Sequence, residues 1–175
     1  MQHQIINKVK KALKDRKVET PMVLNANFDA DRAEQQITSH FFKIMHSLGL
    51  DLEDDSLKDS PKRLGKMYAK EIFYGLDYKN FPKITVIDNK MGAKEAVFIT
   101  DINISSFCEH HFVTIDGKAT VAYIPNKSII GLSKINRVCD FFARRPQVQE
   151  RLVLQIYEAL SAILDTKDVA VSICA

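Results

Sequence analysis

The second half of the chain changes its residue pattern twice, and this change constrains the fold more than any other feature. Residues 96–107 and 112–125 are rich in β-branched and aromatic residues, which is typical of strands. Helical patterns follow at 133–145 and 147–164, and a third strand-like run occupies 168–175. Strands on both sides of two helices predict an α+β fold, in which an antiparallel sheet is covered by helices on one face.

The pair Asp116-Gly117 lies within the second strand-like run. An Asp-Gly pair flanked by β-type residues is a strong signal for a two-residue hairpin turn. We therefore expect the chain to reverse direction there.

The first half of the chain has helical patterns. Between residues 28 and 50, Asp29 or Asp31 can cap a helix that Gly49 ends. Between residues 59 and 76, a second helix is expected. Ser60 is its candidate cap, Pro61 suits its first turn, and Gly75 can end it.

The N-terminal segment is basic and has an apolar face. The apolar residues recur at helical spacing and are Ile5, Ile6, Val9 and Leu13. A short amphipathic helix that packs on the body or on a partner is the simpler interpretation. A targeting or membrane role is the alternative, although the segment lacks the uninterrupted apolar block of a signal peptide.

Composition limits the classes of protein to consider. The 175 residues are 46% hydrophobic and 27% charged, and the net charge is +3. A single globular domain with a real core fits these values, whereas a general nucleic-acid binder does not. Three cysteines without a pairing pattern argue against a secreted disulfide framework. No apolar run approaches the roughly 20 residues that span a membrane. We expect a cytoplasmic protein that binds neither nucleic acid nor membrane.

The stretch FCEHHF, residues 107–112, holds the strongest chemical signal. Cys108 and His111 have the two-residue gap of a zinc half-site, and thiolate and imidazole are preferred zinc ligands. A buried cysteine beside surface histidines would give the same spacing. Beside them, His110 would point elsewhere along an extended chain, free to act as an acid or base near neutral pH.

Two basic groups are candidates for binding an anion. Arg63 and Lys66 share one face of the expected helix near Pro61, where a solvated basic face is the alternative. Ser133, Lys134 and Arg137 lie in the first turns of another expected helix. Because the helix dipole disfavours cations at that end, their presence favours a phosphate site.

Gln149 and Glu150 begin the longest expected helix. A carboxylate in a first turn stabilises a helix by itself, so a purely structural role is possible. Together, a carboxylate and a carboxamide could also bind the edge of a guanine, with its N–H donors and its carbonyl.

Residues 108–137 and 141–152 resemble the GTP cyclohydrolase I family. The likeness extends from about Glu19 to Ala175 and includes residues 59–86. It implies the tunnelling fold, an antiparallel sheet with two helices on one face. It also implies a toroidal homodecamer with active sites between subunits. The family converts GTP to 7,8-dihydroneopterin triphosphate and formate, at the start of folate or tetrahydropterin synthesis, with Zn²⁺ as its cofactor.

The resemblance also implies a role for each candidate residue. Cys108 and His111 match zinc ligands, and His110 matches a catalytic histidine. Gln149 and Glu150 match guanine-binding positions. The residues that match triphosphate-binding positions are Arg63, Lys66, Ser133, Lys134 and Arg137.

One part of the family pattern is not found in this sequence. The resemblance implies a third zinc ligand, a cysteine a few residues after the run VAVSI, with a further histidine and arginine in the same segment. We expect Cys174 not to replace that ligand, and Cys139 to be a small buried residue. On this basis we expect weak zinc binding and little turnover of GTP.

The expected organisation is therefore an N-terminal helical region at 1–95 and a tunnelling-fold catalytic domain at 96–175, incomplete at its C-terminus. The alternative to an enzyme is a nucleotide-binding or assembly module of the same fold that lacks the metal chemistry. Binding of GTP without release of formate would favour that alternative.

Overall fold

The computed structural model describes residues 2–23 and 28–175. The expected helical region at 1–95 includes Met1 and residues 24–27, which lie outside the described residues. The elements, in chain order, are α1 (Gln2–Arg16), α2 (Ala30–Ser47), α3 (Ser60–Lys66), η1 (Met67–Ile72), η2 (Tyr74–Leu76), η3 (Tyr78–Asn80), β1 (Val86–Asp88), β2 (Val97–Cys108), β3 (Thr114–Tyr123), β4 (Ser128–Ile130), α4 (Leu132–Ala143), β5 (Pro146–Gln147), α5 (Gln149–Leu164) and β6 (Val169–Cys174).

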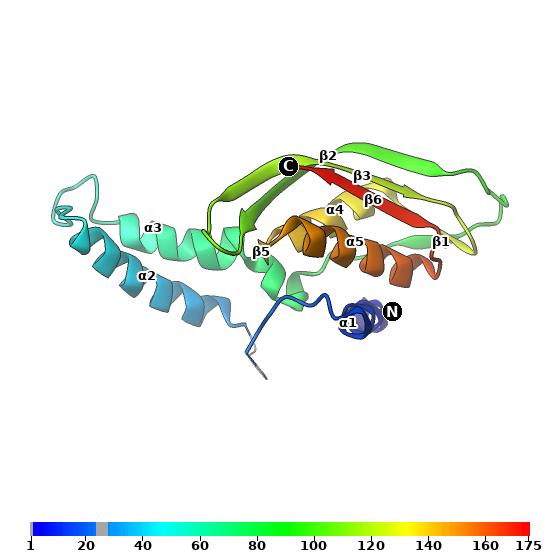
Figure 1. Cartoon of the computed structure of the whole chain (residues 1–175). Coiled ribbons are helices and arrows are strands. Elements are labelled where there is room, and N and C mark those ends of the chain that lie inside the picture. The colour runs from blue at the N-terminus through cyan, green and yellow to red at the C-terminus, as the bar shows by residue number, and fades with distance from the viewer. Residues whose placement is uncertain (1, 24–27) are drawn as a thin grey trace.

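The main sheet has the strand order β5-β2-β3-β6. The β2–β3 and β3–β6 pairs are antiparallel, whereas the short strand β5 runs parallel to β2. Helices α4 and α5 cover one face of this sheet (Figure 1). Ile104 and Val121 of the sheet are buried in one core with Val138 of α4 and Ile156 of α5. This arrangement confirms the predicted α+β fold with helices on one face.

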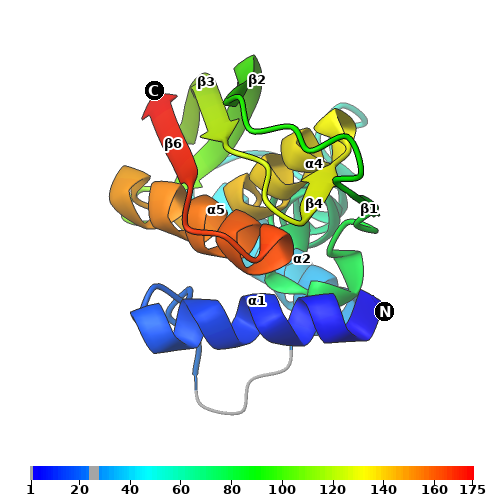
Figure 2. The ribbon, with the colours of Figure 1, turned by 90° about the vertical axis from the view of Figure 1, so that its right-hand side faces the viewer.

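Helix α1 forms a further layer beneath α5 (Figure 2). Its residues Val9 and Leu13 are completely buried in the main core, and Ile5 and Ile6 pack against that core. The predicted amphipathic helix is therefore confirmed as a helix that packs on the body. Within the described residues, none of the helices combines the length and apolar character needed to cross a membrane.

Helices α2 and α3 form an arm that extends away from the sheet (Figure 1). Asp29 caps α2, because its carboxylate accepts hydrogen bonds from the backbone N–H groups of Asp31 and Arg32. This confirms the first of the two predicted caps. A Cβ at Gly65 would lie 2.0 Å from the Thr38 hydroxyl, so glycine permits the close contact between α2 and α3.

The second predicted helix differs at both ends. The cap position is Asp59 rather than Ser60, and its side chain makes no capping hydrogen bond. The helix does not extend to Gly75. Helix α3 continues directly into the π-helical turn η1, which ends at Ile72 with Phe73 as its cap residue. Gly75 instead meets α4 closely, since a Cβ there would lie 2.1 Å from the carbonyl oxygen of Phe141.

The predicted Asp116-Gly117 turn is wrong. Both residues lie inside β3, where Gly117 pairs with Ile104, and the chain reverses earlier, at residues 109–113. Gly117 is needed for a different reason. A Cβ there would lie 2.3 Å from the Cys174 carbonyl oxygen of β6. The small antiparallel β1–β4 pair was not predicted from the sequence.

Candidate active site

The turn between β2 and β3 carries Cys108, His110 and His111. It is closed by two backbone hydrogen bonds. The Cys108 N–H donates to the Val113 carbonyl at 2.9 Å, and the Phe112 N–H donates to the Cys108 carbonyl at 2.9 Å. Phe112 has a φ of 56°, a left-handed conformation that is strained for a bulky residue. Surrounding contacts must therefore hold this turn in shape.

Aromatic packing supplies one such contact. The ring of Phe112 meets the buried ring of Phe73 edge-on, with 5.3 Å between centroids, and Phe107 meets the same ring at 5.8 Å. The two phenylalanines that flank the cysteine and histidines therefore anchor both sides of the turn on the end of η1.

The thiol of Cys108 is surrounded by groups that stabilise its thiolate. Its Sγ lies 3.7 Å from His111 Nδ1 and 3.9 Å from His110 Nδ1. Hydrogen bonding to His111, followed by the backbone N–H groups of His110 and His111, lowers the pKa of Cys108 to about 6. The thiolate, which is the form that binds metals, is therefore the favoured form at neutral pH.

The Cys108–His111 pair has the geometry of two zinc ligands. Tetrahedral Zn²⁺ with Zn–S near 2.3 Å and Zn–N near 2.1 Å places two such donors about 3.6 Å apart. The distance of 3.7 Å between Sγ and Nδ1 matches this value. The same distance also suits a hydrogen bond between the Cys108 thiolate and the His111 imidazole, and this bond would keep the two side chains in this arrangement by itself.

Among the residues that the structure describes, no group of three His, Cys, Asp or Glu side chains could hold a metal ion. Cys174 does not complete the pair. It pairs with Lys118 of β3, which in turn pairs with Asn103 of β2. Asn103 precedes Cys108 by five residues, or about 17 Å along an extended strand. The expectation that Cys174 cannot replace the missing ligand therefore agrees with the strand register.

Glu109 connects the turn to the beginning of α5. Its backbone N–H donates to the Gln147 carbonyl at 3.0 Å. Both guanidinium Nη atoms of Arg151 bind its carboxylate, with the Nη2–Oε1 contact at 3.3 Å. This pairing lowers the pKa of Glu109, so the carboxylate is ionised at neutral pH.

The two predicted guanine-binding residues lie exposed at this same end of α5. The Gln149 Nε2 group donates to the Ile173 carbonyl of β6 at 3.2 Å, which leaves its carbonyl oxygen and one N–H for other partners. The Glu109 contacts to Gln147 and Arg151 bring the predicted guanine residues close to the Cys108–His111 turn.

The three predicted residues of α4 lie farther away within one chain. Ser133, Lys134 and Arg137 occupy the beginning of α4, whereas the end of α4 adjoins the turn, because the Ser106 hydroxyl of β2 donates to the Ala143 carbonyl. The ten residues between Ser133 and Ala143 span about 15 Å of helix. A single chain therefore does not gather the α4 residues around the turn.

Arg63 and Lys66 are exposed on α3, in the α2–α3 arm. Arg63 lies 3.6 Å from Asp59 of its own helix, and the next basic residue on this face, Lys70, pairs with Asp31 and Glu34 of α2 at 2.7 Å each. Lys70 therefore has a structural role, and these contacts leave Lys66 as the more available cation of the arm.

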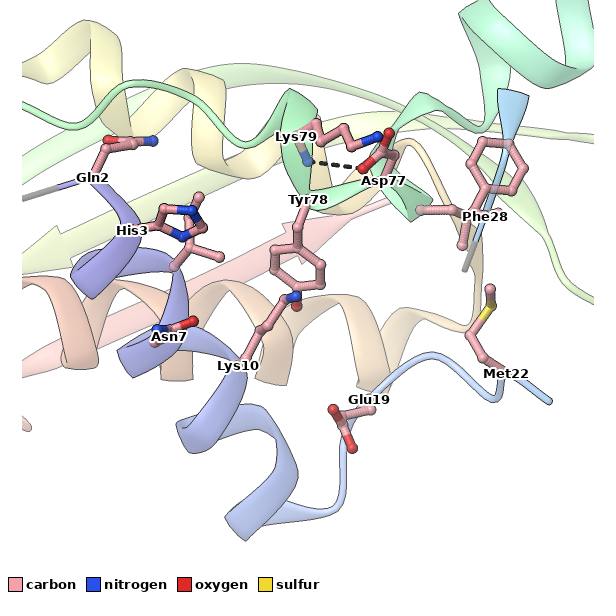
Figure 3. A pocket seen from close by; sticks show the side chains of 12 residues that line it. Gln2, His3, Asn7, Lys10, Glu19, Met22, Phe28, Asp77, Tyr78 and Lys79 are labelled. Atoms are coloured by element: carbon pink, nitrogen blue, oxygen red, sulfur yellow. Dashed lines mark hydrogen bonds between the residues drawn. The ribbon is translucent and has the colours of Figure 1, made fainter. Parts of the chain in front are cut away.

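One pocket lies away from these residues. It has a volume of about 880 Å³ and is formed by α1, the segment after it and the η2–η3 region, with Lys10, Glu19 and Tyr78 among its lining residues (Figure 3). The predicted site residues do not line it.

Comparison with known proteins identifies the family. The family described as GTP cyclohydrolase I matches residues 37–175. A protein named GTP cyclohydrolase 1 from Shewanella amazonensis is 60% identical over 166 residues, which cover 95% of this chain and 76% of the relative. The chain belongs to the GTP cyclohydrolase I family. A relative of the same name from Yersinia pseudotuberculosis is 59% identical over 165 residues, covering 94% of this chain and 74% of the relative.

Membership in the GTP cyclohydrolase I family confirms the resemblance seen in the motifs and makes the chain a hydrolase by family. The α+β architecture agrees with the tunnelling fold of this family. The assignments of individual residues to zinc, triphosphate and guanine stay predictions.

Glu109 and Arg151 were not predicted from the sequence as residues of the site. Arg151 could have been identified from the sequence, because it is a cation in the first turn of α5, where the helix dipole disfavours positive charge. The same reasoning drew attention to Lys134 and Arg137. What the sequence could not supply was the partner of Arg151, which is 42 residues away along the chain.

Proposed function

We propose that this chain is a GTP cyclohydrolase I, which hydrolyses GTP at C8, releases formate and forms 7,8-dihydroneopterin triphosphate. The observation that carries the proposal is the turn in which Cys108 and His111 stand at the separation of zinc ligands with His110 beside them. Family membership supports the same reaction. We further propose that the product enters folate or tetrahydropterin synthesis in the cytoplasm.

We propose Zn²⁺ as the cofactor, held by Cys108 and His111. When bound, zinc supplies a Lewis acid that brings the pKa of a coordinated water close to neutral. Strand β6 runs toward the turn, because its pairs with β3 proceed from Val169–Tyr123 to Cys174–Lys118.

His110 is the proposed proton carrier. Its side chain is exposed, and its ring is turned by 70° relative to that of His111. An imidazole there can accept a proton from the attacking water and return one to a ring nitrogen of the purine as the C8–N bond breaks. Gln149 and Glu150 are proposed to hold the guanine, with Glu150 accepting N–H groups and Gln149 donating to the carbonyl.

Arg63, Lys66, Ser133, Lys134 and Arg137 are proposed to bind the triphosphate. Because one chain leaves Ser133, Lys134 and Arg137 at the far end of α4, we propose that a neighbouring subunit supplies these three residues. The toroidal decamer implied by the resemblance would do so. Burial of these cations around a triphosphate would then follow assembly.

A second candidate function is a nucleotide-binding module without metal chemistry. The described residues offer two metal donors rather than three, which favours weak retention of zinc. Such a module would bind GTP through Gln149 and Glu150 and release no formate.

The test is to load the protein with zinc, supply GTP, and measure formate together with the fluorescence of the oxidised pterin product. Formate and pterin should form slowly and in equal amounts, as weakly bound zinc would allow, and both should be lost after treatment with a chelator. His110→Ala should keep its zinc and lower turnover by about 10²–10⁴-fold. Cys108→Ala and His111→Ala should lose both zinc and turnover.

Two matched variants serve as controls. His40→Ala removes an exposed histidine of α2, and Cys174→Ala removes an exposed cysteine of β6. Both should behave like the unmodified protein. Binding of GTP with no formate at any zinc concentration would reject the enzyme and support the binding module.

A further inference from the structure

The ion pair between Glu109 and Arg151 joins two parts of the proposed site that are far apart in the sequence. Glu109 lies between the proposed zinc ligands Cys108 and His111, and Arg151 directly follows the proposed guanine residues Gln149 and Glu150. The two nitrogens of the Arg151 fork face the two oxygens of the Glu109 carboxylate. A fork of this kind fixes orientation as well as distance.

Three features distinguish this pair from an ordinary surface ion pair. Its side chains are only 24% and 18% exposed. A backbone hydrogen bond from the Glu109 N–H to the Gln147 carbonyl lies beside it, so two separate contacts join the turn to the beginning of α5. Arg151 also stands in the first turn of α5, where the helix dipole disfavours a cation, and the nearby Glu109 carboxylate offsets this cost.

The pair also reaches the proposed proton carrier. Glu109 Oε1 lies 3.8 Å from His110 Nε2. One carboxylate is therefore bordered by the guanidinium of α5 on one side and by the imidazole of the turn on the other. Rotation of Glu109 away from Arg151 would change the surroundings of His110 as well as the path of the turn.

We propose that Glu109 and Arg151 form a positioning pair that fixes the metal-binding turn relative to the guanine-binding end of α5. This proposal rests on the proposed function, because that function assigns zinc to the turn and guanine to the beginning of α5. Whether the ion pair holds the two segments together can be tested without it. Neither residue needs to touch the substrate. Their role is to keep C8 of a bound purine in reach of the groups on the turn, where an error of about 1 Å can cost 10²-fold in rate.

Hydrogen exchange tests the connection in the absence of metal and GTP. In Arg151→Gln and Glu109→Gln, we expect the amides of residues 108–113 to exchange about tenfold faster than in the unmodified protein, because the turn opens more often. The double variant should match the faster single variant, since each change removes the same contact. In Arg151→Lys, the exchange rate of these amides should lie between those of the unmodified protein and of Arg151→Gln, because a lysine keeps the charge but cannot bind both carboxylate oxygens as a guanidinium does.

Arg144→Gln is the matched control. Arg144 is 27% exposed and pairs with Asp140 on α4, so this change also removes a partly buried arginine from an ion pair. It should leave exchange in the turn unchanged. Equal exchange in Arg151→Gln and the unmodified protein, or additive effects in the double variant, would overturn the proposal.

The Co²⁺ affinity and the turnover of Arg151→Gln, compared with those of the unmodified protein, then distinguish the positioning role from the proposed function. Loss of groups that orient metal ligands commonly lowers metal affinity about 10–100-fold, and we expect a loss of this size for Co²⁺ followed by its thiolate absorption band. In turnover, Arg151→Gln should lower kcat and raise KM together, as both ends are displaced. If the unmodified protein releases no formate, the proposed function fails, while the exchange data still decide the positioning role.

Discussion

Cys108 and Cys139 show how differently the fold treats the same residue type. Cys108 lies at the edge of the molecule, where a histidine and two backbone N–H groups lower the pKa of its thiol to about 6. Cys139 is completely buried in α4, and burial raises the pKa of its thiol to about 12. This burial agrees with the prediction that Cys139 is a small core residue.

The contrast gives a prediction for Cys139. In the native protein at neutral pH, iodoacetamide should leave Cys139 unmodified, because its thiol is both inaccessible and protonated. Unfolding in guanidinium chloride should expose it to full alkylation. Mass spectrometry of the peptide that contains Cys139 measures both states, and alkylation in the folded protein would show that α4 opens readily.

For single residues, the spacing along the sequence predicted which side chains lie close together, but it did not predict contacts between residues far apart in the sequence. The two-residue gap between Cys108 and His111 predicted that their side chains converge, and they do. The Glu109–Arg151 contact could not be read in the same way, because it depends on the parallel pairing of β5 beside β2. The spacing of residues predicts the geometry within one segment. Contacts between segments far apart in the sequence can be predicted only when the order of the strands is known.

Among the elements, helix periodicity was the most reliable signal and glycine the least. The apolar face of α1 was predicted residue by residue and is buried as expected. Gly75 and Gly117 were both interpreted as ends or turns. Each instead lets a neighbouring backbone approach closely, at Phe141 and at Cys174. A glycine needed for close approach and one needed for a turn look the same in a single sequence.

Gly117 gives the second prediction. Its replacement by alanine should push β6 away from β3, because the new Cβ would lie 2.3 Å from a backbone oxygen that cannot rotate away. Overpacking of this kind costs about 1–3 kcal/mol in the free energy of unfolding, measurable by urea denaturation. Asp116→Ala at the neighbouring exposed position is the control and should change stability little. A Gly117→Ala variant of unaltered stability would contradict the β3–β6 register.

For the whole molecule, the distribution of the proposed site residues is the main result. The turn and the beginning of α5 lie together, whereas Ser133, Lys134 and Arg137 lie at the opposite end of α4. The sequence showed which residue types were present but not that one chain would separate them. Separation follows from the direction of α4, whose end rather than its beginning adjoins the turn.

A third prediction follows from this separation. His110→Ala and Lys134→Ala should each be inactive alone, yet refolding them together should restore activity. If each site takes these residues from different subunits, random mixing leaves roughly a quarter of the sites intact. Formate release from the mixture measures this. Complementation should be absent when His110→Ala is mixed with Glu150→Ala, since both residues belong to the same part of one chain.

The strand order has a consequence for how the protein can be studied. Strand β6 ends the sheet, so alternate residues from Val169 to Cys174 direct their backbone groups toward β3 and the others direct them outward. The segment VAVSIC also has no charge to discourage pairing with another strand. The outward amides should exchange with solvent at a rate that depends on protein concentration, and the inward ones should not. Hydrogen exchange within this one strand would therefore provide an internal gauge of self-association.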